Sequence, residues 1–288
     1  MGNRWMDLLQ RTWKEARSRK PFPLYIFYHI AKTAGTTFRV HLEKHLQPFE
    51  ILPVYPPGTI RYFNVRQSHY ATIDETYDPD AYLGSLTEPE KNRIRIILGH
   101  KVRYGIHRHF HREARYLTFL RDPVDRALSF HAFQKKRFEA GGMPDGEKKY
   151  FLDPGGRFLE FEEWLRVFKS HAFIVSFNLA KDFYGHRFPS PVDPRVCVEL
   201  AKKVLREFFF VGITETFSQW APYLYGFFGI RETPEPKAVN LDPSYLNARS
   251  DLRRRFAAEF SYDRELYEYA KALCAGHLKK HSVPSSFW

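Results

Sequence analysis

The 288-residue sequence has only two cysteines, Cys197 and Cys274, and it has no long uninterrupted apolar stretch. Two thiols do not make a disulfide framework, so a reducing compartment is the simpler expectation. No run approaches the ~18 apolar residues that a membrane-spanning helix needs. Residues 1–20 also lack a hydrophobic signal core. We therefore expect a soluble, cytoplasmic protein with no transmembrane segment.

The charge of the chain is strongly asymmetric. Its 45 Lys and Arg residues outnumber 33 Asp and Glu residues and give a formal net charge of +12. This excess favours anionic partners such as nucleotides, nucleic acids or acidic glycans, and it equally fits a generally basic surface. Hydrophobic residues make up 43% of the chain and aromatic residues 17%, which indicates a globular protein with a sizeable core.

Four short apolar runs predict the strands of a buried sheet: residues 24–30, 94–98, 116–120 and 208–213. Each run is apolar nearly throughout, which is typical of a parallel strand covered on both faces. Helical spacing follows the first and third runs, where apolar residues recur every four positions. The alternation predicts an α/β fold with a central parallel β-sheet flanked by helices in three layers.

The remaining segments are less regular. Residues 47–90 are rich in Pro, Tyr and Asp, with a helix start near Thr87. Residues 136–157 hold many Gly, Pro and charged residues, which predicts the clearest loop of the chain. Residues 245–280 predict two helices.

Each apolar run ends in polar or glycine-containing sequence. The four endings are Ala31-Lys32-Thr33, Gly99-His100, Arg121-Asp122-Pro123 and Thr214-Glu215. In open parallel sheets, ligands bind beyond the carboxyl ends of the strands. We therefore expect a binding site at this edge of the sheet.

The first ending leads into a short loop, Ala31 to Thr37, before the next helix. Ala34 and Gly35 allow close approach of the backbone to a ligand, and the N–H groups at a helix start favour an anion. Lys32 adds a positive charge, and hydroxyl donors come from Thr33, Thr36 and Thr37. A plain strand-to-helix turn capped by a Thr explains one Thr and the Gly, but not the Lys at the tip with three hydroxyls. The loop is also not a Walker A motif, because Lys32 precedes Gly35.

A second anion-binding candidate begins at the third ending. Asp122 is a suitable helix N-cap and Pro123 a suitable first helical residue. Arg121 then lies at the tip of a strand with a forked donor suited to phosphate, and Ser129 lies two helical turns on. The two could hold one anion together. A capped helix with a solvent-exposed Arg is the alternative.

Together these two segments resemble the 5′-phosphosulfate loop and the 3′-phosphate motif of the sulfotransferase superfamily. Two further segments, 211–217 (VGITETF) and 262–270 (YDRELYEYA), are similar to motifs of the carbohydrate-acting sulfotransferase family 2 branch. That branch includes heparan sulfate 2-O-sulfotransferase and bacterial relatives. The four matches occur in order between residues 24 and 275.

The resemblance implies a P-loop-like sandwich fold and the function of a sulfotransferase. The expected co-substrate is 3′-phosphoadenosine-5′-phosphosulfate, with no metal. Lys32 would contact the 5′-phosphate and bridging oxygen, and Arg121 and Ser129 would hold the 3′-phosphate. The loop donors are Thr33, Ala34, Gly35, Thr36 and Thr37. The acceptor would be the hydroxyl of a saccharide, an anionic one included, and no nucleic acid is expected as a partner.

A histidine provides the candidate catalytic base. His100 follows Gly99 at a strand end, where it could remove the proton of an acceptor hydroxyl. In the family branch a Gly-His at this strand end carries the base. The heparan-acting relatives have His-Gly-His, whereas Leu98 occupies the first position here. A structural histidine at a strand end is the alternative.

The segment after His100 contributes further candidates. Alternate histidines in 107–111 suggest a metal site, but no carboxylate or cysteine completes one, so an exposed basic, aromatic stretch is favoured. It follows His100 closely, which makes Arg103, Tyr104 and His107 candidates for acceptor binding. The basic residues of 135–149 suggest either a clamp for an anionic glycan or a solvated loop.

The domain organisation follows from the same assignments. We expect a single domain over residues 1–288, with an N-terminal helical extension (1–20), an insertion near the acceptor site (130–195) and C-terminal helices (245–288). Two other functions stay open. One is a P-loop-like nucleotide kinase, and the other is a non-catalytic basic protein that binds a glycan or nucleic acid.

Overall fold

The computed structural model describes residues 22–58, 60–64, 66–168, 173–189, 191–232 and 251–280. Its centre is a five-stranded parallel sheet in the order β2-β5-β1-β6-β7. The strands are β1 (Leu24–Tyr28), β2 (Ile51–Pro53), β5 (Ile96–Gly99), β6 (Ala114–Leu120) and β7 (Phe210–Ile213). The chain places β2 and β5 on one side of β1, then crosses to β6 and β7 on the other. Ligands bind where strand order reverses in this way.

The apolar runs of the sequence formed the strands that they predicted. β1 and β5 are buried along their whole length, and so is β7. The sequence did not predict β2, which has three residues and ends in Pro53 at the edge of the sheet. It also did not predict the antiparallel hairpin of β3 (Arg61–Asn64) and β4 (His69–Thr72), whose residues are mostly exposed. β2 is buried but only three residues long, and the hairpin has no buried apolar run, so neither gave a clear signal.

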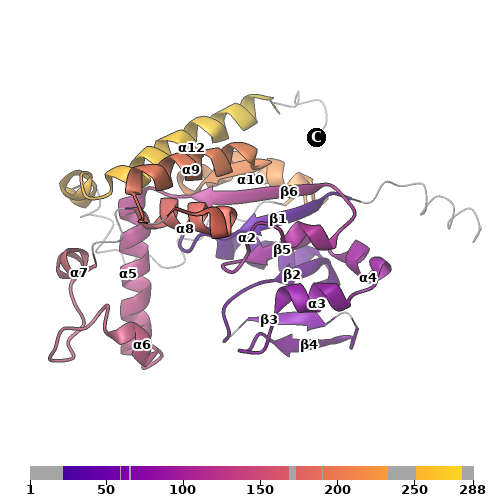
Figure 1. Ribbon diagram of the computed structural model, residues 1–288, viewed down its shortest axis with the longest axis horizontal. Helices are drawn as coiled ribbons and strands as arrows, with labels where there is room; N and C mark the ends of the chain where they lie inside the picture. The colour runs from indigo at the N-terminus through magenta and orange to yellow at the C-terminus, as the bar shows by residue number, and fades with distance from the viewer. Residues whose placement is uncertain are drawn as a thin grey trace, which may run out of the picture.

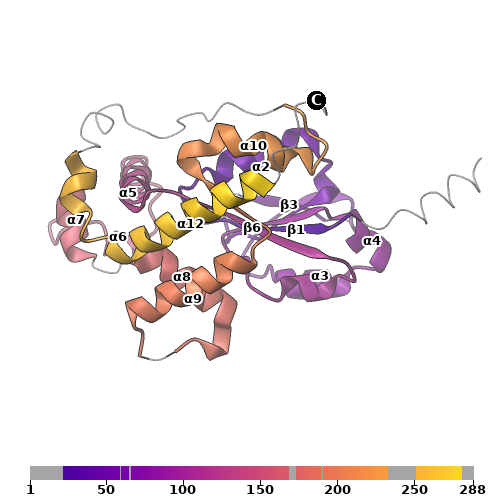
Figure 2. The ribbon, with the colours of Figure 1, turned by 90° about the horizontal axis from the view of Figure 1, so that it is seen from above.

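Helices cover both faces of the sheet (Figures 1 and 2). On one face lie α2 (Gly35–His45) and α10 (Phe217–Gly226), where the Phe38 ring is 5.1 Å from Phe27 and 5.4 Å from Tyr225. On the other lie α8 (Ile174–Tyr184) and α9 (Pro194–Glu207), where Phe183 packs 5.5 Å from both Tyr28 and Tyr116. The predicted three-layer α/β sandwich is confirmed.

The other elements lie around this sandwich. Two short helices, α3 (Pro79–Ser85) and α4 (Glu88–Arg93), lie in the connection between the hairpin and β5. Thr87 begins α4 with a capping box that includes Glu90, as its position in the sequence indicates. At the C-terminal end, residues 251–256 are helical and α12 (Ser261–Lys280) packs against α9 and β7. The expected N-terminal extension, 1–20, lies outside the described residues.

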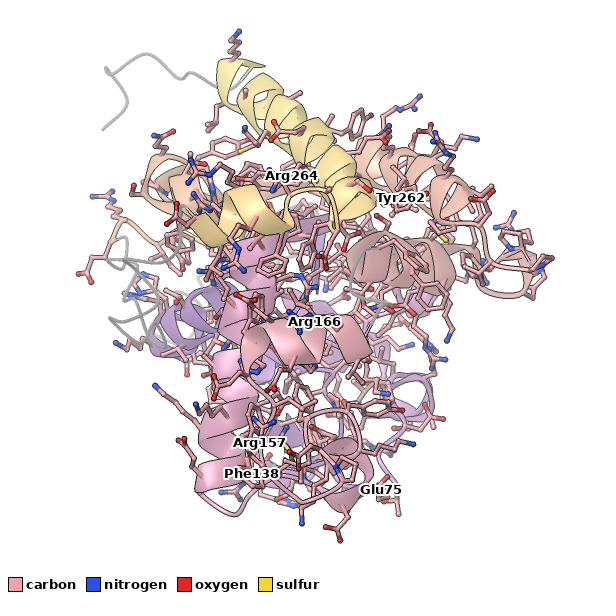
Figure 3. All side chains as sticks on the ribbon, turned by 90° about the vertical axis from the view of Figure 1, so that its left-hand side faces the viewer. Glu75, Phe138, Arg157, Arg166, Tyr262 and Arg264 are labelled. Carbon is pink, nitrogen blue, oxygen red and sulfur yellow. The ribbon has the colours of Figure 1, made fainter. Side chains whose placement is uncertain are left out.

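The helix α5 (Pro123–Glu139) extends from the end of β6 away from the sheet (Figure 1). A second apolar cluster packs along it, with Trp164 and Leu165 of α7 (Phe161–Val167) and with Phe256 and Phe260. In Figure 3, Phe138 marks the far end of α5, and Arg264 of α12 lies towards its opposite end.

The long loop expected at 136–157 needs correction. Residues 136–139 continue α5, and α6 (Asp145–Lys148) forms a further short helix. Arg137 bonds both Gln134 and Glu147, at 2.8 and 2.9 Å, which ties the helix end to α6. The basic stretch 135–149 is therefore partly helical and ion-paired rather than an irregular loop.

Candidate functional site

The carboxyl ends of the central strands bring the candidate residues together. In the register of the sheet, Tyr28 of β1 pairs with Gly99 of β5 and with Thr118 of β6. The residues that follow, His29 and His100, are therefore neighbours. Arg121 follows β6 on the other side of β1. The sequence motifs thus lie on adjacent strands rather than at separate places on the surface.

The loop after β1 has a strained backbone. Lys32 and Ala34 have φ angles of 70° and 68°, and only one other non-glycine residue of the described chain, Ser68, has a positive φ. Ala34 is the N-cap of α2 and makes no side-chain capping bond, and the first turn of α2 contains no acidic residue. The N–H groups at this helix start are thus available to an anion, and strain of this kind concentrates at ligand-binding sites.

The threonines of this loop differ in their roles. The Thr33 hydroxyl is fully buried and donates to the Ile30 carbonyl at 2.7 Å, so its proton holds the loop together. Only its backbone N–H is left as a donor to a ligand. Thr36 is exposed and Thr37 half-buried, and neither hydroxyl has a partner among the described residues. These two are the hydroxyl donors that face outward.

The packing around Gly35 explains why this position is a glycine, and the sequence did not reveal this explanation. A Cβ atom at this position would lie 2.1 Å from Cδ2 and 2.2 Å from Nε2 of His29. The imidazole of His29 therefore occupies the space that a side chain would need. Glycine is required here by the packing of His29, in addition to any ligand.

Lys32 lies in a cluster of positive charge. Its Nζ is 4.6 Å from the centre of the Phe133 ring of α5. Burial, followed by repulsion from Arg121 and Lys136, lowers the pKa of Lys32 to about 8. Two other cations thus act on Lys32, and a place of this kind stabilises an anion.

Arg121 connects the two predicted anion motifs. Its Nη1 donates to the carbonyl of Lys32 at 3.3 Å, which links the end of β6 to the loop after β1. Asp122 caps α5 as predicted, because its Oδ1 accepts from the N–H groups of Val124 and Asp125. Ser129 lies two turns along α5 and is buried. The N–H of Asp122 in turn donates to Glu215 at 3.0 Å, which ties in the segment after β7.

The geometry of His100 fixes which of its nitrogens can act as a base. Its Nδ1 lies 2.6 Å from the backbone carbonyl of His29. A carbonyl only accepts, so Nδ1 carries the hydrogen and the neutral ring has its lone pair on Nε2. Burial lowers the pKa of His100 below 6.5, against the opposing effect of this hydrogen bond. The ring is therefore neutral near pH 7, and part of it is exposed at a cavity.

The imidazole of His29 packs against the imidazole of His100. The two rings stack with centroids 4.1 Å apart, and Nδ1 of His29 lies 2.8 Å from the Tyr55 hydroxyl. Burial, and then the neighbouring His100, holds the pKa of His29 well below its ordinary value. The sequence analysis did not assign a role to His29 or Tyr55.

A cavity of about 400 Å³ opens beside His100. Three aromatic side chains, Phe130, Trp164 and Phe168, contribute to its wall. Its polar lining residues include Tyr28, Lys101, Arg126, Asn178 and Asp182. The Tyr28 hydroxyl donates to Asp182 at 2.6 Å. The sequence did not reveal these residues, because they come from segments up to 154 positions apart that only the fold brings together.

The predicted acceptor residues do not line this cavity. Arg103 lies 3.9 Å from Asp80, and Nδ1 of His107 lies 2.8 Å from the Tyr116 hydroxyl. Tyr104 is half exposed, and its backbone N–H donates to the Asp182 carbonyl at 3.4 Å. Of the three, only Tyr104 is linked directly to a residue of the cavity wall.

The histidines of 107–111 have separate partners. His109 lies 2.9 Å from Asp80 and His111 lies 4.0 Å from Glu88, while His107 is held by Tyr116. Within the described ranges, no group of three or more His, Cys, Asp or Glu side chains is arranged to hold a metal ion. Cys197 and Cys274 are buried, free thiols.

The fold and the site can be compared with those of known proteins. Neither protein-family models nor curated proteins match this sequence. Among solved structures, the chain is similar to a sulfotransferase from Alicyclobacillus acidocaldarius, with 16% identity over 88% of this chain and 96% of that one and a TM-score of 0.41. None of the described helices has the length and apolarity needed to span a membrane.

Proposed function

We propose that this protein is a sulfotransferase that moves the sulfuryl group of 3′-phosphoadenosine-5′-phosphosulfate to an acceptor hydroxyl. One observation carries the proposal: a cationic loop at a helix start, a second cation bonded to that loop, and a neutral histidine with a free Nε2 all lie at one edge of the sheet. The first two suit a donor with phosphates at two places, and the third suits deprotonation of a hydroxyl.

The donor would bind across the ends of β1 and β6. Lys32 and the backbone N–H groups of residues 33–37 would hold the 5′-phosphosulfate, with the hydroxyls of Thr36 and Thr37. Arg121 and Ser129 would hold the 3′-phosphate, and this contact would distinguish the donor from ATP. The repulsion of Lys32 by Arg121 and Lys136 supports this assignment, because a bound anion would offset that electrostatic cost.

The reaction would be an in-line transfer. Nε2 of His100 takes the proton of the acceptor hydroxyl as its oxygen bonds to sulfur. The bond between sulfur and the bridging oxygen breaks, and its electron pair stays on the 5′-phosphate. Lys32 stabilises the charge that develops on that oxygen. As in phosphoryl transfer, positioning and electrostatics carry most of the catalysis, and no step calls for a metal.

The carbonyl of His29 has a defined part in this scheme. It fixes the tautomer of His100 before the reaction, and it stabilises the imidazolium that forms when Nε2 takes the proton. The hydrogen bond from the ring N–H to this carbonyl becomes stronger when the ring becomes charged. The lowered pKa of His100 keeps the ring neutral and ready to act as a base.

A saccharide is the acceptor class that we propose. Aromatic side chains at the cavity wall suit the apolar face of a sugar ring, and Asn178 and Asp182 suit its hydroxyls. The assignment to the carbohydrate-acting branch rests on the sequence motifs alone.

Binding and transfer experiments test the proposal separately. Calorimetry should detect 3′-phosphoadenosine-5′-phosphate and much weaker binding of ADP, which lacks the 3′-phosphate. Labelled sulfate from the donor should appear on a saccharide panel, and label from the γ-phosphate of ATP should not. Equal affinity for ADP and the 3′-phosphorylated nucleotide would contradict the donor assignment, and phosphate transfer would favour the kinase alternative.

A further inference from the structure

Arg126 is a buried cation in the second turn of α5. Its side chain is 9% exposed, and its Nε is fully buried with no hydrogen-bond partner among the described residues. Within these residues no carboxylate lies within 4 Å of its guanidinium. Burying a charge without a partner is costly, and such a group in a folded protein calls for an explanation.

The carboxylate whose charge stabilises Arg126 is already committed elsewhere. Asp263 of α12 accepts from the N–H groups of Val175 and Ser176, both at 2.9 Å, and from the Ser176 hydroxyl at 2.6 Å. Its oxygens therefore cap the start of α8. Asp263 attracts Arg126 through space, while Arg121 repels it. Among the described residues, Arg126 has an electrostatic neighbour but no hydrogen-bond partner.

The position of Arg126 on α5 indicates which ligand could pair with its guanidinium. The residues of α5 that line the cavity are Arg126, Ala127 and Phe130. Ser129 and Phe133, which belong to the donor side, lie on a neighbouring face of the helix, because successive residues are turned by about 100°. The cavity contains His100 but not Lys32 among its lining residues. Arg126 also lines a narrow pocket with Arg121 and Thr33, but its volume of about 10 Å³ holds no more than a water molecule. An anion that reached Arg126 through the larger cavity would therefore come with the acceptor.

The rest of the cavity restricts the acceptor further. Its volume of about 400 Å³ lies near the lower end of small-molecule pockets, which span roughly 300–1,000 Å³. This volume suits one or two rings rather than a long polymer segment. Asp182 carries a carboxylate that would repel a second anion placed beside it. The aromatic wall offers a surface for a ring to stack on.

We propose that the cavity binds a compact hydroxylated ring compound with one anionic substituent, and that Arg126 pairs with this substituent while a hydroxyl faces His100. The role of the hydroxyl rests on the proposed function, whereas the pairing with Arg126 does not. A bidentate contact between the guanidinium and a carboxylate would supply a hydrogen-bond partner that Nε of Arg126 lacks among the described residues.

A matched pair of probes tests the pairing. The compounds 4-nitrophenyl β-D-glucuronide and 4-nitrophenyl β-D-glucoside differ only in a carboxylate against a hydroxymethyl group. Calorimetry and saturation-transfer NMR measure their affinities without donor. We expect the glucuronide to bind about tenfold or more tightly, the size of a charge-assisted contact. Arg126→Gln should remove this preference and leave the affinity for the glucoside within about twofold. Arg206→Gln, at an exposed position of α9, is the matched control and should keep the preference.

Several outcomes would overturn the inference. One is equal binding of the two probes to the unmodified protein, and another is binding of neither at millimolar concentration. Weaker binding of 3′-phosphoadenosine-5′-phosphate by Arg126→Gln would assign Arg126 to the donor instead. If both Arg126→Gln and the charge-preserving Arg126→Lys fail to fold, Arg126 is a structural residue and the proposal is wrong.

The same measurements separate this inference from the proposed function. A protein that binds the glucuronide through Arg126 but does not bind the 3′-phosphorylated nucleotide would refute the sulfotransferase and leave the anion pairing intact. The reverse result, nucleotide binding without any preference between the probes, would refute the pairing alone.

Discussion

The imidazole of His100 donates its Nδ1 hydrogen to the backbone carbonyl of His29, 2.6 Å away, and stacks on the imidazole of the same residue. Because a main-chain atom makes the bond, it does not depend on the identity of the side chain at position 29. The side chain sets the position of the His100 ring by stacking, and the carbonyl sets its tautomer. A substitution of the His29 side chain should therefore change the position of the His100 ring and leave its tautomer unchanged.

Replacing the base should affect turnover and not donor binding. We expect His100→Ala to lower kcat by roughly 10²–10⁴-fold, the usual contribution of a general base. The affinity for 3′-phosphoadenosine-5′-phosphate should stay within about twofold, because His100 does not contact the donor phosphates in the proposed arrangement. Steady-state kinetics and calorimetry measure the two effects. The control is His111→Ala, an exposed histidine outside the site. Full activity in His100→Ala would show that His100 is only structural.

Replacing the strand-end arginine should affect donor recognition. Arg121→Ala should weaken binding of 3′-phosphoadenosine-5′-phosphate by about tenfold to a hundredfold, because a charge-assisted contact is lost. ADP should bind this variant and the unmodified protein about equally. Calorimetric titration with both nucleotides checks the expectation. Unchanged affinity for the 3′-phosphorylated nucleotide would remove Arg121 from the 3′-phosphate site.

The activity should depend on pH with two limbs. His100 must be neutral, so kcat/KM should rise with pH through its pKa, which lies below 6.5. Lys32 must be charged, so kcat/KM should fall as pH passes its pKa of about 8 in the free enzyme. Lys32→Arg keeps its charge at all these pH values and should lose the alkaline limb. If the alkaline limb persists in this variant, another group causes it.

The contact between Gly35 and His29 predicts a loss of stability and of activity together. In Gly35→Ala the new methyl would overlap the imidazole of His29, and overpacking of this kind costs about 1–3 kcal/mol. A displaced His29 would also displace His100, so kcat should fall. Denaturant unfolding and kinetics measure the two effects.

Two further variants serve as comparisons for Gly35→Ala. Gly84→Ala, in α3 with open space around the glycine, should be neutral or slightly stabilising. Combining Gly35→Ala with His29→Ala should recover part of the lost stability, because the smaller side chain makes room. If the single variant is as stable as the original, the proposed packing of Gly35 against His29 is wrong.

Local signals in the sequence were enough for four of the five strands of the sheet and for the N-terminal ends of α4 and α5. The buried strands are continuous apolar runs, and Asp122 with Pro123 is an N-terminal pattern that depends on neighbouring residues only. β2 was missed because a three-residue strand is too short to give a clear signal, and the β3–β4 hairpin was missed because its residues are mostly exposed. The continuation of α5 through residues 136–139 was missed because the Gly and Pro residues that follow dominated the composition of that stretch.

The residues of the candidate site also fall into two groups, those that the sequence predicted and those that only the fold revealed. Lys32, Arg121 and His100 stand at strand ends, where the topology of a parallel sheet brings residues together whatever the details of packing. Arg126, Trp164 and Asp182 come from different helices, and their convergence depends on how those helices pack. No local pattern encodes the bond from Tyr28 to Asp182, which joins residues 154 positions apart.

The left-handed conformation of Lys32 and Ala34 has a consequence for how a ligand is received. A non-glycine residue in this region costs of order 1–2 kcal/mol relative to the right-handed one, and the chain carries that cost twice before any anion is present. The amide groups are therefore aimed in advance, and an incoming anion does not have to order the loop. Association should then proceed without a slow conformational step, and Ala34→Gly, which relaxes the backbone, should slow binding while making the folded loop less strained.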